Sequence, residues 1–107
     1  MARVGASTLL DFPLKKLPLQ VLIADDNQSM RMALRRVLDE LPDVEVCAVA
    51  IDGREAVEMA LTLKPDLLIV DLVMPGLSGV GVIGLVKKKL HMAKSILFTT
   101  KIRWANS

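Results

Sequence analysis

Short apolar runs alternate along this sequence with stretches in which apolar residues recur at helical spacing. Runs of this length, rich in Val, Ile and Leu, are typical of strands. We expect strands at Leu19–Asp25, Val44–Ala50, Asp66–Asp71 and from Lys94 or Ser95 to Thr99. The first run is apolar on both faces, which is typical of a strand buried inside a parallel sheet.

Three amphipathic stretches separate the runs and predict helices. The first contains Met30, Leu34, Val37, Leu38 and Leu41 at helical spacing. Either Asn27 or Ser29 can cap this helix, and Pro42 ends it. The second helix is expected around Ala56–Leu61 and the third from about Val80 to Leu90. Strands that alternate with helices of about a dozen residues imply βαβ units and a mostly parallel sheet.

Small residues shape the connections and interrupt the third helix. Asp52 and Gly53 are expected to form a turn, and the Pro- and Gly-rich segment Met74–Gly79 is expected to be a loop,. The third helix is apolar around most of its circumference and contains Gly81 and Gly84. Each interior glycine costs about 1 kcal/mol relative to alanine.

Two of the expected strands run directly into aspartate. Val21–Ala24 is followed by Asp25 and Asp26, and Leu67–Val70 is followed by Asp71. If both runs are neighbouring parallel strands, the three carboxylates meet at one edge of the sheet, where ligands of parallel α/β sheets bind. Like charges this close repel strongly unless a cation lies among them. Oxygen ligands of this kind suit Mg²⁺ best, with Mn²⁺ or Ca²⁺ as substitutes.

Composition narrows the classes of function. The chain has 107 residues, is 52% hydrophobic and contains only three aromatic residues, which predicts one domain with an aliphatic core. A net charge of +2 and the scarcity of base-stacking aromatics argue against direct binding of nucleic acid,. Cys47 is the single cysteine, which excludes an internal disulfide and favours a reducing compartment.

The sequence also bears on location and domain boundaries. No run reaches the roughly 18 apolar residues of a membrane span, and the amino terminus lacks the apolar core of a signal peptide. We therefore expect a cytoplasmic protein with no membrane partner. Residues 1–18 show no sustained period and are expected to form a flexible arm, followed by a folded domain over residues 19–107.

Four segments carry these motifs in order, namely LQVLIADDNQSM, AIDGREAVEMA, KPDLLIVDLVMPGLSG and ILFTT. They cover Leu19 to about Thr100. In this combination they resemble a bacterial response-regulator receiver domain. The resemblance implies a flavodoxin-like, doubly wound α/β fold with a parallel sheet in the strand order 2-1-3-4.

The same resemblance implies roles for individual residues. Asp71 would be the phosphoacceptor, phosphorylated by a histidine kinase. Asp26, Asp71 and the backbone carbonyl of Val73 would hold Mg²⁺ directly, with Asp25 acting through a metal-bound water. Thr99, or Thr100 in the alternative register, matches the hydroxyl residue at the end of the fourth strand that responds to phosphorylation. The chain would then be a phosphoacceptor signalling module of a two-component system and not an enzyme in the turnover sense.

The sequence departs from the family after the fourth strand. Ser107 lies eight positions beyond Thr99 (107 − 99), whereas a complete receiver continues through a fourth helix, a fifth strand with a phosphate-pairing lysine, and a fifth helix. We expect an incomplete sheet whose open edge favours a homodimer or a swapped dimer.

Two other classes of function are compatible with this sequence. One is a truncated, phosphorylation-deficient module for binding or dimerisation. The other is a phosphatase of the haloacid dehalogenase type, which also uses an aspartate at a strand end. That class would want a second aspartate two residues after Asp71, where this chain has Val73.

Overall fold

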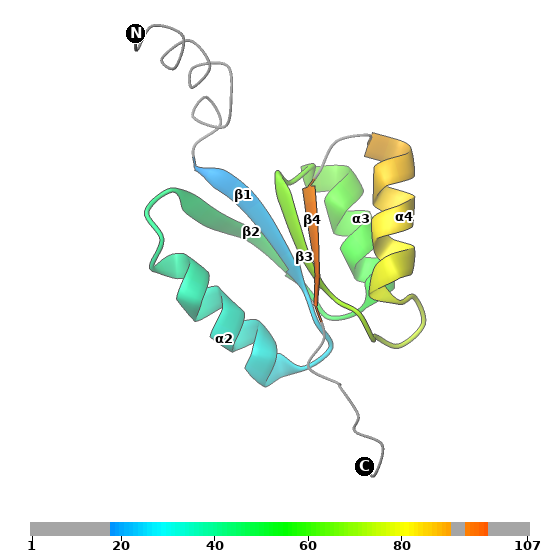
Figure 1. The fold of residues 1–107 in the computed structure, drawn as a ribbon, viewed down its shortest axis with the longest axis horizontal. Coiled ribbons are helices and arrows are strands. Elements are labelled where there is room, and N and C mark those ends of the chain that lie inside the picture. Colours follow the sequence, from blue (N-terminus) through cyan, green and yellow to red (C-terminus); the bar gives the residue numbers. More distant parts are fainter. Residues whose placement is uncertain (1–17, 91–93, 99–107) are drawn as a thin grey trace, which may run out of the picture.

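The computed structural model describes residues 18–90 and 94–98. Strands and helices alternate in the order β1 (Leu19–Ala24), α2 (Gln28–Asp39), β2 (Val44–Ala50), α3 (Gly53–Leu63), β3 (Leu67–Asp71), α4 (Gly79–Leu90) and β4 (Lys94–Phe98). The predicted α/β class is therefore confirmed (Figure 1). The arm predicted over residues 1–18 lies outside the described residues except for Pro18.

The strands form one parallel sheet in the order β2-β1-β3-β4. This is the order 2-1-3-4 that the resemblance implies. The chain leaves β1 toward β2 on one side and returns to β3 on the other, so the topological switch lies between β1 and β3. Ala24 at the end of β1 is opposite Val70 in β3. The residues that follow these two positions therefore emerge at the same edge of the sheet.

Helices cover both faces of the sheet, with α2 on one face and α3 and α4 on the other (Figure 1). The core on the α3–α4 side contains Leu22, Ala24, Ala50, Ala56, Ala60, Leu68, Val70, Met74, Val82 and Val86. The core on the α2 side contains Val21, Ile23, Val46 and Ile69, with Leu34 and Leu38 packed against them. Residues Val21–Ala24 are fully buried, as predicted for a strand that is apolar on both faces.

The first helix of the described residues, α2, begins at one of the two N-cap residues that the sequence predicts. Asn27 is the N-cap of α2, and its side-chain oxygen accepts a hydrogen bond of 2.9 Å from the backbone N–H of Met30. Ser29 lies inside the helix. The N-cap therefore directly follows the two aspartates at the end of β1, which fixes where the helix starts relative to them.

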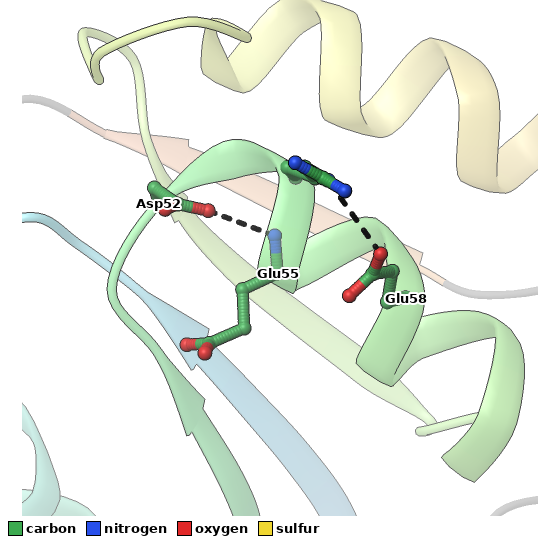
Figure 2. Close-up of polar contacts among 4 residues, drawn as sticks. Asp52, Glu55 and Glu58 are labelled. Carbon is green, nitrogen blue, oxygen red and sulfur yellow. Dashed lines mark hydrogen bonds and ion pairs between the residues drawn. The ribbon is translucent and has the colours of Figure 1, made fainter.

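The second helix starts earlier than the sequence predicts. Asp52 is its N-cap and Gly53 its first residue, where a turn is expected from the sequence. The Asp52 carboxylate accepts from the N–H of Glu55 at 2.8 Å (Figure 2), and the Glu55 carboxylate accepts from the N–H of Ile51 at 2.9 Å. These bonds form a variant of the capping box in which the Glu55 carboxylate reaches the N–H of the residue before the N-cap,. In the same helix, Arg54 forms an exposed ion pair of 3.7 Å with Glu58, which is labelled in Figure 2.

The third helix exposes apolar side chains, as its sequence predicts. Val80 is 58% exposed and Leu85 39% exposed, whereas Val82 and Val86 are fully buried. In the described part of the chain, none of the helices has the length and apolar character needed to cross a membrane.

Candidate metal centre

Three aspartates meet at the carboxyl edge of the sheet. Asp25 and Asp26 follow β1, and Asp71 is the last residue of β3. One carboxylate oxygen of each aspartate lies within 4.8 Å of the others. The structure thus brings together the three side chains that the sequence predicts to meet, because β1 and β3 are adjacent and end at the same level.

The three aspartates differ in burial. Asp25 and Asp71 are fully buried, whereas Asp26 is partly exposed. Two unit charges at this separation repel by about 3 kcal/mol when the effective dielectric constant is about 20. A buried group of like charges is costly unless a cation or another positive group offsets it.

The donor set is appropriate for a hard divalent cation. The group consists of carboxylate oxygens alone. Mg²⁺ prefers oxygen ligands and is usually bound by one or two carboxylates together with water. The residues present therefore fit Mg²⁺ by the chemistry of their donors and by their separation.

Asp25 is held in place by hydrogen bonds to its backbone and to its side chain. Its backbone N–H donates to the carbonyl of Ala50 at 3.2 Å, and its Oδ1 accepts from the N–H of Asn27 at 2.9 Å. Its own carbonyl accepts from Nη1 of Arg31 at 2.8 Å. These bonds orient the carboxylate and place a positive charge beside the acidic edge.

Arg31 is a contributor that sequence reasoning misses. Its position in the helical pattern puts it on the polar side of α2, where a solvated arginine is the ordinary expectation. In the structure it is partly buried and its guanidinium returns to the strand end. The one feature of the sequence that points to this role is the position of Arg31 four residues after Asn27, close to the start of the helix and to the end of β1.

Asp71 is connected to the loop that follows it. The N–H of Val73 donates to Oδ1 of Asp71 at 3.3 Å, and the N–H of Gly79 donates to the carbonyl of Leu72 at 3.0 Å. The loop is thereby closed on itself between β3 and α4. Val73, whose carbonyl the resemblance implies as a ligand, is adjacent to the carboxylate. Thr99 lies outside the described residues.

Cys47 is not a member of this group. It lies on β2 and packs against the core on the α3–α4 side. Burial raises the pKa of the Cys47 thiol, with a smaller contribution from the negative charge of Glu45. A thiol with a raised pKa is a weak metal ligand because the thiolate is the binding form.

The arrangement has clear counterparts among known proteins. The sequence profile of the response regulator receiver domain matches residues 21–105. Protein-glutamate methylesterase/protein-glutamine glutaminase 1 of Geobacter sulfurreducens is 48% identical over 71 residues, which are 66% of this chain and 20% of that protein. The transcriptional regulatory protein LiaR of Bacillus subtilis is 38% identical over 84 residues, or 78% of this chain and 40% of that protein. The chain thus spans less than half the length of these relatives.

Solved structures match the fold as well. The response regulator domain of Thermotoga maritima CheB matches with a TM-score of 0.74 and 38% identity, over 81% of this chain and 64% of that one. The REC domain of AraT, a response regulator from Geobacillus stearothermophilus, matches with a TM-score of 0.71 and 38% identity, over 78% and 65%. The similarity therefore extends over most of the described residues.

Proposed function

Since this chain belongs to the family of response regulator receiver domains, we propose that it is a phosphoacceptor signalling module phosphorylated on Asp71. The observation that supports Asp71 as the phosphoacceptor is its burial beside two other carboxylates. Asp71 is fully buried at the end of β3, with carboxylate oxygens of Asp25 and Asp26 within 4.8 Å. A nucleophilic carboxylate in such a group is suited to attack phosphorus once the incoming negative charge is offset.

The proposed reaction transfers a phosphoryl group from a phosphohistidine. A carboxylate oxygen of Asp71 attacks phosphorus, the phosphorus–nitrogen bond breaks, and the imidazole leaves with the electron pair and takes up a proton. The product is an acyl phosphate, which adds about −1.5 to −2 charge at the edge of the sheet. Bound Mg²⁺ supplies positive charge that offsets the phosphoryl oxygens.

Residues of the chain would bind the metal, orient the phosphoacceptor and respond to the phosphoryl group. Asp26, Asp71 and the carbonyl of Val73 would hold Mg²⁺, and Asp25 would act through a water. The N–H of Val73 orients the Asp71 carboxylate. The Arg31 guanidinium fixes the backbone of Asp25. In this proposal Thr99 donates a hydrogen bond to the phosphoryl group and links phosphorylation to a change in the following segment.

The proposal includes a histidine kinase as the phosphoryl donor. It also includes a cytoplasmic location, because a kinase forms phosphohistidine there from ATP. It assigns no turnover to this chain. The esterase activity named for the methylesterase relatives belongs to proteins of which this chain spans about a fifth.

A second candidate function is that of a binding or dimerisation module that is not phosphorylated. The observation that favours it is the outer surface of α4, where Val80 and Leu85 are exposed. In addition, β4 is an edge strand of the described sheet, and edge strands offer backbone groups for pairing with another chain.

Acetyl phosphate distinguishes the two candidates. We expect the folded wild-type chain, incubated with acetyl phosphate and Mg²⁺, to gain a single phosphoryl adduct by intact-mass spectrometry. Chelation of Mg²⁺ with EDTA should prevent it, because the three carboxylates would then repel the incoming phosphoryl oxygens. A folded chain that gains no adduct with Mg²⁺ would contradict the proposal and favour the binding module.

A further inference from the structure

Gly53, the first residue of α3, contacts the loop that follows Asp71 (residues 72–78). A Cβ added at Gly53 would lie 2.8 Å from Cβ of Leu77 and 2.9 Å from its carbonyl carbon, and closer still to its carbonyl oxygen. Side-chain carbons essentially never approach other atoms so closely. Two of these atoms belong to the backbone of Leu77 and its Cβ is fixed by that backbone, so none of them can turn away as the end of a flexible side chain can.

The requirement for glycine at this position is one of space. Among the described glycines only Gly76 has a positive φ, of 79°. Gly53 is buried and has an ordinary helical conformation. Any residue could therefore adopt the backbone of Gly53, but a side chain there would displace Leu77.

The α3 side of this contact is fixed. The Asp52 carboxylate accepts from the N–H of Glu55 in the first turn of α3 (Figure 2). The Glu55 carboxylate accepts from the N–H of Ile51, which directly follows β2, so the first turn of α3 is tied to the end of β2. The N–H of Ala56 also donates to the carbonyl of Asp52 at 3.0 Å. A side chain at position 53 would therefore push the loop more readily than the helix.

The loop side of the contact leads to the candidate metal centre. The N–H of Leu77 donates to the carbonyl of Pro75 at 3.0 Å, and the loop is closed by the bond between Gly79 and Leu72. Val73 lies inside this closed loop and donates to Asp71. Since only Met74, Pro75 and Gly76 separate Leu77 from Val73 along the loop, we expect a displacement of Leu77 to reach Val73.

We infer that Gly53 is a positioning residue of the phosphorylation site. The absence of a side chain at Gly53 lets the carbonyl of Leu77 approach α3, and this contact sets the position of Val73 relative to Asp71. The inference rests on the proposed function, because the properties it concerns are the affinity for Mg²⁺ and the rate of phosphorylation. It assigns Gly53 no contact with the metal or the phosphoryl group.

The test is Gly53→Ala, with Gly84→Ala as the matched control. Both changes add one methyl group to a glycine of a helix, but a Cβ at Gly84 meets nothing within 4 Å. Changes to groups that orient metal ligands typically lower metal affinity by about 10–100-fold. We expect Gly53→Ala to weaken Mg²⁺ binding on the order of tenfold and to slow phosphorylation by acetyl phosphate, while Gly84→Ala leaves both unchanged.

Mg²⁺ affinity is measured by titration of amide NMR signals, phosphorylation by intact mass, and folding by circular dichroism. A folded Gly53→Ala protein with the Mg²⁺ affinity and phosphorylation rate of wild type overturns the inference and leaves the proposed function intact. A folded wild-type chain that neither binds Mg²⁺ nor accepts a phosphoryl group overturns the proposed function, and the inference with it.

If Gly53→Ala does not fold, titration of the amide NMR signals of the wild-type chain with Mg²⁺ tests the inference instead. Mg²⁺ should then shift the amide signals of Leu77 and Gly53, and should leave Leu63, at the far end of α3, in place. This result supports transmission between the loop and the start of α3. A Gly53 signal that Mg²⁺ does not move overturns the inference.

Discussion

Asp71→Asn is expected to abolish the phosphoryl adduct that the wild-type chain gains from acetyl phosphate and Mg²⁺. Asparagine has nearly the shape of aspartate, so the buried position at the end of β3 is preserved. Its amide lacks the negative charge and the nucleophilic oxygen of the carboxylate, and it is a poorer ligand for Mg²⁺. Intact-mass spectrometry of the two proteins under identical conditions measures the difference.

Asp39→Asn is the matched control for this prediction. Asp39 lies at the last position of α2, is exposed, and forms a long ion pair of 3.8 Å with Arg35. Its substitution should leave the adduct unchanged. An adduct of wild-type yield on Asp71→Asn would show that another carboxylate accepts the phosphoryl group, which would contradict the role proposed for Asp71.

Asp25→Asn is expected to change Mg²⁺ affinity and stability in opposite directions. The substitution removes one of three carboxylates that lie within 4.8 Å of one another, so it should relieve repulsion in the metal-free protein. In a domain of this size a gain of about 1 kcal/mol raises Tm by about 4–8 °C. The affinity for Mg²⁺ should fall by about 10–100-fold, as for other groups that support a metal through its outer shell.

Thermal unfolding in EDTA and in Mg²⁺ measures both parts of this prediction. The metal-free variant should unfold at a higher temperature than metal-free wild type, and Mg²⁺ should stabilise it less. Asp39→Asn should change neither quantity. A metal-free variant that is less stable, with unchanged Mg²⁺ affinity, would mean that Asp25 serves only as a turn former through its bond from Asn27.

The main features of the fold follow from the sequence because burial leaves a pattern in it. The run Val21–Ala24 is apolar at every position, and in the structure both of its faces are covered. The three aspartates could be predicted to meet for a related reason. Each follows a buried strand, and the carboxyl ends of adjacent parallel strands lie at the same edge.

The start of α3 could not be predicted in the same way. An Asp-Gly pair ordinarily indicates a turn, whereas here Asp52 caps a helix and Gly53 begins it. The difference arises because Glu55 completes the capping box with the N–H of Ile51. The contact of Gly53 with Leu77 joins two elements that no sequence period relates.

Arg31 and Thr99 illustrate two other limits of sequence reasoning. Arg31 belongs to the polar face of α2 by periodicity, yet its long side chain returns to the carbonyl of Asp25. Periodicity describes the direction of the Cβ and not where a flexible guanidinium ends. The role of Thr99 stays a prediction, since the described residues end at Phe98.

Borohydride reduction of the phosphorylated wild-type chain, followed by peptide mass spectrometry, tests most directly whether the three aspartates form a phosphorylation site. Borohydride reduces an acyl phosphate to an alcohol, so a phosphorylated aspartate becomes homoserine. We predict homoserine at position 71 alone, and only in samples that contained Mg²⁺. Homoserine at another aspartate, or in equal yield at position 71 with EDTA, would contradict the proposed site.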